Sequence, residues 1–162
     1  MISTTLIKLI EIHATSLAND VARDLASNSR TPAFRGVPVD DLVQRVFQIY
    51  HHLGNWIGDP GATMVREEFA EWGGKRFGQG VPLSEVVYAV VIIKSHLRRY
   101  IREHGLVDAV FPRAEAEYIL PVHLHSLQDL NEQVSNFFDE AMYYLAQGYE
   151  RAALNRAASS AR

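Results

Sequence analysis

Seven histidines are the residues of this chain best suited to bind a metal or a haem iron, because the sequence contains no cysteine. His51 and His52 are adjacent, so on a helix their side chains point about 100° apart. His123 and His125 also diverge. Neither pair has the i, i+4 spacing of two zinc-binding imidazoles, and no HExxH motif occurs. We therefore predict no metal site.

Two further histidines, His96 and His13, have the spacing of side chains on buried helix faces. His96 shares a helical line with Ala89 and Tyr100, and His13 falls on an apolar stripe of the first helix. Two interpretations are open. Each is a core histidine bonded to a backbone carbonyl, or His96, Tyr100 and His13 face one cavity and bind haem or another planar small molecule.

Other candidates for catalytic chemistry have simpler interpretations. The solvent-exposed face of the third predicted helix accounts for three acidic residues, Glu67, Glu68 and Glu71. The lone pair Gly78 and Gly80 follows no predicted strand and lacks the third glycine of a dinucleotide fingerprint, so it indicates a turn. No Ser, His and Asp spacing marks a nucleophile elbow. The sequence predicts no catalytic residues and no enzyme activity.

Length and charge restrict the class of protein. The 162 residues fit one domain, and 16 Lys and Arg against 19 Asp and Glu give a formal charge of −3, which argues against a nucleic-acid partner. The densest basic cluster falls on one flank of a helix and is interpreted as a solvated face, with binding of phosphate or of a partner as the alternative. Its members are Lys94, Arg98, Arg99 and Arg102.

The N-terminal residues 1–16 lack a basic leader, a long apolar run and a small-residue cleavage site. The longest apolar run, Val86 to Ile93, is far shorter than the roughly 20 residues that span a bilayer. We expect a cytoplasmic protein that contacts no membrane.

Apolar periodicity predicts an all-α bundle of about five helices, with no sustained alternation typical of strands. The first helix carries an apolar stripe from Leu6 through His13 to Leu25. The second begins near Asp40 and ends at residues 58–61, where glycine and proline cluster. The third covers the residues before Gly73 and Gly74, which are expected to fray or kink it.

The fourth and fifth predicted helices make up the C-terminal half. The fourth, Leu83 to His104, is apolar on nearly every side and ends at Gly105, which is expected to adopt a left-handed cap. The fifth begins at Pro112, reaches about Ala153, and is expected to kink or split at Pro121. Residues 1–155 are thus predicted to form one domain, and residues 156–162 a frayed or flexible tail.

Large aromatic side chains are concentrated in the last predicted helix. A core stripe includes Phe137 or Phe138, whereas Met142, Tyr143 and Tyr149 lie partly off that stripe. Packing within one chain, a homodimer interface and the wall of a ligand cavity are the three interpretations. For the second of these, the candidate interface residues are Phe138, Met142, Tyr143 and Tyr149.

Three segments, in this order and spacing, carry a resemblance to a known family. They are Tyr50-His51-His52-Leu53-Gly54-x-Trp56, Arg76-Phe77-Gly78-Gln79-Gly80-Val81-Pro82-Leu83, and the stretch from Phe137 to Glu150. Together they span most of residues 38–150, and they resemble the N-terminal domain of RsbR-type proteins, the RsbT co-antagonists of bacterial stress signalling, of the RsbRD N-terminal type.

The resemblance implies an all-helical domain, bundle-like or globin-related, that dimerises and transmits a signal and does not turn over a substrate. Related globin-like domains lack haem, so no cofactor is expected. No STAS segment, kinase core or DNA-binding motif follows Glu150, so the expected partner is another protein or an output domain outside this chain. The alternative is a small-molecule carrier or haem-type sensor with His96 as the ligand.

Overall fold

The computed structural model describes residues 2–105 and 116–162, and in these residues the only regular elements are helices. The predicted all-α class is confirmed, although the described residues form seven α-helices instead of about five. Pro112, the predicted start of the last helix, lies outside the described residues. The elements are α1 (Ile2–Ile12), α2 (Ala14–Ser27), the 3-10 helix η1 (Pro32–Gly36), α3 (Val39–His51), α4 (Leu53–Gly58), α5 (Thr63–Gly78), α6 (Leu83–His104) and α7 (Ala116–Ser160).

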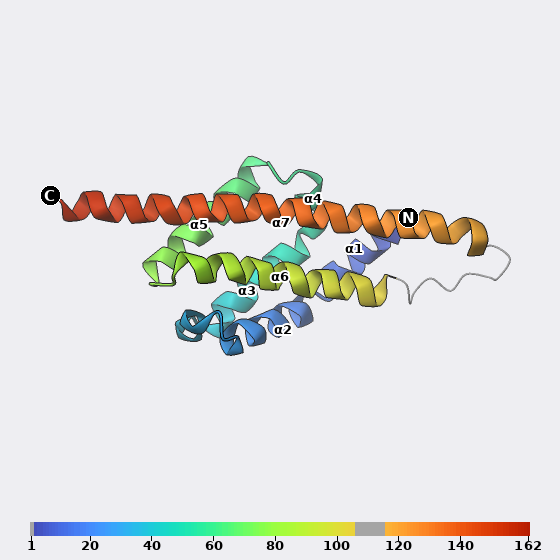
Figure 1. Cartoon of the computed structure of the whole chain (residues 1–162), viewed down its shortest axis with the longest axis horizontal. Coiled ribbons are helices and arrows are strands. Elements are labelled where there is room, and N and C mark those ends of the chain that lie inside the picture. The colour runs from blue at the N-terminus through green and yellow to red at the C-terminus, as the bar shows by residue number, and fades with distance from the viewer. Residues whose placement is uncertain (1, 106–115) are drawn as a thin grey trace.

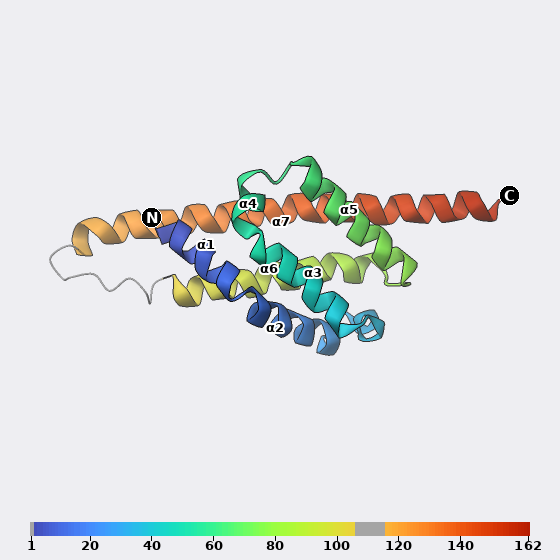
Figure 2. The same cartoon turned by 180° about the vertical axis from the view of Figure 1, so that it is seen from behind.

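The 45-residue helix α7 organises the bundle and is about 68 Å long at 1.5 Å per residue. It packs most extensively against α5 and also contacts α6, α1 and α4, while α2 packs on α3 and α6. Both views of the chain show the C-terminal part of α7 running past the other helices (Figures 1 and 2). Part of α7 is therefore packed in the bundle, and its C-terminal part extends beyond the other helices.

The first predicted helix is divided at His13 into α1 and α2. Its buried stripe contains Ala14, which is fully buried, whereas His13 is exposed. Both residues fit a spacing of three or four between Ile10 and Leu17, so periodicity alone does not distinguish them. The bond from the Leu17 N–H to the His13 carbonyl continues the helical pattern across the junction, which makes it a local deviation and not a loop.

The second predicted helix is divided in the same way. A local deviation at His52, with φ −101° and ψ 11°, separates α3 from α4, and α4 then ends at Gly58 as the sequence predicted. Trp56 of α4 is buried, and its ring meets rings from α5 and α7.

Two predictions about glycines were wrong. Helix α5 continues through Gly73 and Gly74 to Gly78, because these glycines face α7 at close range and are held by it. Gly105 ends α6 with φ −68° and ψ −24°, which is right-handed backbone. A side chain there would overlap the Ile101 carbonyl and Leu127, so space and not backbone conformation accounts for this glycine.

Helix α7 continues through Pro121, so of the two predicted effects of this proline, a kink or a split, the split does not occur. The proline is the sixth residue of the helix, so the backbone bond that it removes lies within the first two turns. The helix also extends beyond Ala153 to Ser160 and includes residues 156–160 of the predicted tail.

The core of the bundle contains a cluster of aromatic rings from three helices. Trp56 of α4, Phe69 and Trp72 of α5, and Phe137 of α7 lie with ring centroids 4.6–6.4 Å apart. Such contacts add about 0.5–1.5 kcal/mol per pair beyond the burial of area. A buried hydrogen bond joins α3 to α6, in which the Tyr50 hydroxyl donates to the Ile93 carbonyl at 2.7 Å.

Candidate functional site

A surface hollow of about 500 Å³ brings together the three predicted ligand-binding residues, His96, Tyr100 and His13. The ring centroids of His13 and Tyr100 are 6.3 Å apart, and Tyr100 stacks on His104 with centroids 4.0 Å apart. Asp20, Arg99 and Glu103 complete much of the polar lining. The hollow lies where α1 and α2 meet α6. Because its lining includes these charged side chains, it is a polar surface site.

His96 has a charged partner and does not face an apolar space. Its Nε2 lies 2.7 Å from Oδ2 of Asp24 on α2, and the side chain is largely buried. Partial burial alone raises the pKa of Asp24, but hydrogen bonds from His96 and Asn28 and the charge of Arg99 outweigh burial and hold that pKa below its ordinary value of 3.8. The pair therefore ties α2 to α6.

The residues of this hollow do not fit haem. An axial ligand needs a free imidazole nitrogen directed into an apolar slot, whereas Nε2 of His96 contacts a carboxylate and the lining is charged. The apolar cavity in the core, between α2, α3, α5 and α6, has a volume of only about 50 Å³, far less than a macrocycle occupies.

Of the remaining histidines, His51 and His52 contact each other edge to face, with ring centroids 5.2 Å apart. His51 stacks on Phe47, His52 stacks on Trp56, and His123 is bonded through Nε2 to the Gly105 carbonyl. Within residues 2–105 and 116–162, no three metal-binding side chains converge on one point. His123 is thus a buried histidine bonded to a backbone carbonyl, the environment that the sequence suggested for His96 and His13 and not for this residue.

Glycines bring the backbones of α5 and α7 into close contact. A Cβ placed on Gly73 of α5 would overlap the Leu145 carbonyl of α7, and one on Gly148 of α7 would overlap the Ala70 carbonyl of α5. Because neither glycine has a side chain, the two backbones approach each other directly. This crossing fixes where α7 lies on the bundle.

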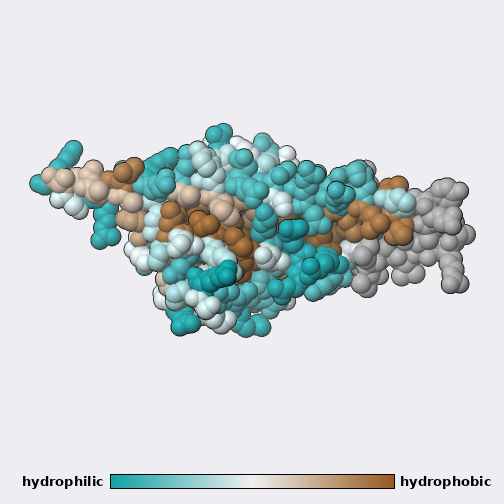
Figure 3. Space-filling model, viewed as in Figure 1, coloured by the Kyte–Doolittle hydropathy of each residue, from teal (hydrophilic) through white to brown (hydrophobic). Residues whose placement is uncertain are grey.

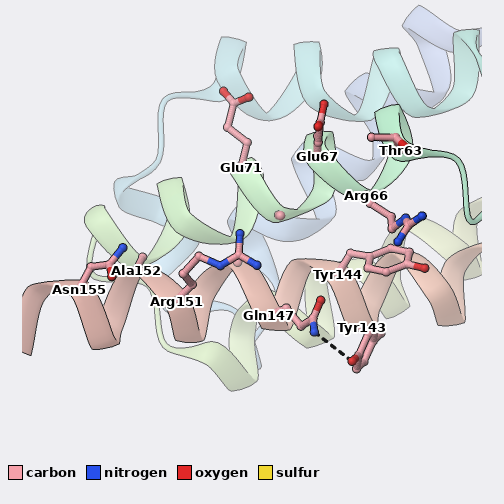
Figure 4. A pocket seen from close by; sticks show the side chains of 12 residues that line it. Thr63, Arg66, Glu67, Glu71, Tyr143, Tyr144, Gln147, Arg151, Ala152 and Asn155 are labelled. Carbon is pink, nitrogen blue, oxygen red and sulfur yellow. Dashed lines mark hydrogen bonds between the residues drawn. The ribbon is translucent and has the colours of Figure 1, made fainter.

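A polar groove of about 830 Å³ opens beside this crossing (Figure 4). Arg66 of α5 reaches toward the ring of Tyr144, at 5.9 Å from its centroid, and Arg151 of α7 extends toward α5. Glu67 and Glu71 also line the groove, so its charges balance. The remaining lining is Thr63, Ala70, Tyr143, Gln147, Gly148, Ala152 and Asn155.

The turn between α5 and α6 is bound to its surroundings at several points. Arg76 is buried and lies 3.0 Å from Asp41 of α3 and 2.6 Å from Gln79. Gly80 has φ +73°, the left-handed backbone that glycine adopts without strain. The Tyr149 hydroxyl of α7 donates to the Val81 carbonyl at 2.7 Å, so α7 contacts this turn directly.

Two cross-links show that α6 and α7 run antiparallel. One is the Tyr149 bond to Val81, and the other is the ion pair of Lys94 with Asp139 at 3.0 Å. Between them lies an apolar surface on both helices, which we call the α6–α7 strip. Its residues, half-buried or exposed, are Leu83, Val87, Val91, Met142 and Ala146.

Figure 3 shows this strip as a hydrophobic patch over the first half of α6 and the adjacent α7. Toward the C-terminal end of α6 the surface becomes hydrophilic (Figure 3). There α6 and α7 enclose a second groove of about 560 Å³, which we call the basic groove. It is lined by Ser95, Arg98, Arg99, Ile101, Arg102, Leu127 and Asn131.

The four predicted interface residues have different positions. Phe138 is completely buried in the core of its own chain, so it offers no surface to a partner. Tyr149 is half-buried against Phe77 and the Val81 carbonyl. Met142 belongs to the α6–α7 strip, and Tyr143 is exposed beside the groove of Figure 4.

Some residues of these sites were not predicted from the sequence. Asp24 carries no spacing signal toward His96, because the two are 72 positions apart. Leu83, Val87 and Val91 do recur at steps of four, but an apolar helix hides which of its faces is exposed. Gly73 has a detectable signal in its small size, but that signal by itself indicates helix breaking and not a close helix contact.

Comparison with known families gives one match. A family model described as the RsbT co-antagonist protein rsbRD N-terminal domain matches residues 15–162. Searches of curated proteins and of solved structures found no match. In the described part of the chain, no helix is both long enough and apolar enough to cross a membrane.

Proposed function

Since the chain belongs to the family of RsbT co-antagonist protein rsbRD N-terminal domains, we propose that this regulatory domain acts in the cytoplasm through protein contacts and not through catalysis. The observation that carries the proposal is the position of α7. This helix contacts α5, α6, α1 and α4 and then runs past them (Figure 1). A change in the packing of the bundle therefore alters how its exposed C-terminal part is presented to a protein partner.

The proposal includes a homodimer formed through the α6–α7 strip. The five strip residues carry no charge, so a second copy placed on the strip meets no like charge. A two-fold axis through it would lay α6 and α7 of each copy together as four helices, an arrangement that buries apolar side chains efficiently. The exposed Val91 at its centre is then covered.

Sedimentation velocity at several micromolar concentrations tests this dimer. We expect wild type to sediment as a dimer and Val91→Asp to shift toward monomer with an unchanged circular dichroism spectrum, because the carboxylate would be desolvated in the interface. Ile12→Asp is the matched control, since Ile12 is 74% exposed on α1, outside the strip. A monomeric wild type contradicts the dimer, and an unchanged Val91→Asp dimer moves the interface elsewhere.

Native mass spectrometry of freshly purified protein separates signalling through protein contacts from carriage of a small molecule. A dimer of bare chain mass supports the proposal. A stoichiometric organic mass that disappears on denaturation supports the carrier function instead. The same spectrum gives the number of subunits independently of hydrodynamic shape.

A further inference from the structure

The basic groove has the size and position of a small-molecule site. Its volume of about 560 Å³ falls within the range of roughly 300–1,000 Å³ that is typical of ligand pockets. Arg98 and Arg102 line it from α6, and Leu127 and Asn131 line it from α7. A molecule bound there would contact both helices at once.

The charges of the groove are of one sign. No acidic residue is among its lining residues, and neither Arg98 nor Arg102 forms an ion pair with any carboxylate of the described residues. Like charges at i, i+4 repel each other on a helix. The helix dipole stabilises the charge of Arg102 in the last turn of α6. Arg98 lies one turn earlier, where this stabilisation has fallen off. The groove of Figure 4 differs, because two glutamates there balance two arginines.

Hydrogen-bond donors surround the same space. Each guanidinium presents a planar set of N–H groups that matches two phosphate oxygens. Asn131 uses one amide hydrogen to bond the Leu127 carbonyl at 3.0 Å, and its Nδ2 carries a second hydrogen. Ser95 adds a hydroxyl from α6.

We propose that the basic groove binds a small soluble anion that carries one or more phosphate groups. Arg98 and Arg102 pair with the phosphate oxygens, and Asn131 donates to the same ligand from α7. Bound in this way, the anion restrains α7 against α6. This site is independent of the α6–α7 strip, so it does not rest on the proposed dimer.

Isothermal titration calorimetry with inorganic pyrophosphate at constant ionic strength tests the site. We expect saturable binding by wild type that is tighter than binding of sulfate. The double variant Arg98→Gln with Arg102→Gln should bind at least about tenfold more weakly, because a charge-assisted hydrogen bond contributes at least that factor. Asn131→Ala should weaken binding about tenfold, because its amide donates to an ionised phosphate oxygen.

The matched control is Arg23→Gln with Arg35→Gln, which removes the same charge from exposed positions on α2 and η1. If this control loses as much affinity for pyrophosphate as the groove variant, the effect comes from net charge alone and the proposal is overturned. Absence of pyrophosphate binding by wild type would also overturn it. Binding only to phosphatidylglycerol vesicles, or only to an oligonucleotide, would assign the arginines to a membrane or a nucleic acid and reject the soluble anion.

Discussion

Gly148 of α7 lies so close to Ala70 of α5 that a methyl group on the glycine would overlap the Ala70 carbonyl. Gly73 of α5, one turn along that helix from Ala70, has the same relationship to the Leu145 carbonyl of α7. The two contacts are reciprocal, with one glycine on each helix. They explain why α5 and α7 form the most extensive helix pair among the described residues.

Gly148→Ala should lower the free energy of unfolding by about 1–3 kcal/mol, because an overlap with backbone can be relieved only by moving a helix. The gain in helix propensity of up to about 1 kcal/mol does not offset this cost. Gly78→Ala is the control, since a Cβ there meets no atom within 4 Å, and it should leave stability equal or higher. Urea unfolding measures both, and an unchanged Gly148→Ala would refute the close crossing.

Asp24→Asn should reduce stability at neutral pH but not in strong acid. The pKa of Asp24 is held below 3.8 in the folded chain, so its contribution is complete above that pH and is lost as the pH falls through the lowered pKa. The urea midpoint of wild type minus that of the variant should therefore shrink below pH 3.8. The exposed Asp59→Asn is the control, and a difference that grows in acid would contradict the His96 contact.

Arg76→Met should destabilise the fold by about 3 kcal/mol, because it leaves the partly buried Asp41 without its inner partner. Lys75 is the other partner of Asp41, and its side chain is 41% exposed. Lys75→Met should therefore cost no more than about 1 kcal/mol. Chemical unfolding of the two variants gives the comparison. Equal losses would show that burial of Arg76 does not determine the energy of this cluster.

Tyr149→Phe should cost about 1 kcal/mol, since it removes one hydrogen bond to the Val81 carbonyl and keeps the ring against Phe77. Hydrogen exchange should increase at the amides of Gly80 and Val81, whose turn loses its link to α7. Tyr143→Phe is the control, because the Tyr143 hydroxyl is exposed and bonds only Gln147. Equal exchange in both variants would exclude a link through Tyr149.

Much of the fold could be predicted because the apolar stripes are long. Residues such as Leu17, Val21 and Leu25 recur at helical spacing and are buried as expected. Periodicity does not fix the junctions at His13 and His52, because the backbone there stays close to helical. It also does not show that Met64, an apolar residue at the start of α5, is 60% exposed.

The sites were harder to predict because they depend on contacts between distant segments. The sequence placed His96 on an apolar line, but the partner that decides its environment, Asp24, lies on another helix. Phe138 is a candidate interface residue in the sequence because the last helix carries more large rings than its core stripe is expected to bury, yet the core accepts both Phe137 and Phe138 at 0% exposure. The family resemblance, which uses the order of several segments at once, was confirmed.

The glycine crossing also acts as a pivot for α7. Any tilt of α7 against α5 displaces the helix least at Gly148 and more with distance along its axis. Asn131 lies about 26 Å to one side of that point and Ser160 about 18 Å to the other, at 1.5 Å per residue. A sideways movement at the basic groove therefore reappears at the far end of α7 in the opposite direction, at about two thirds of its size.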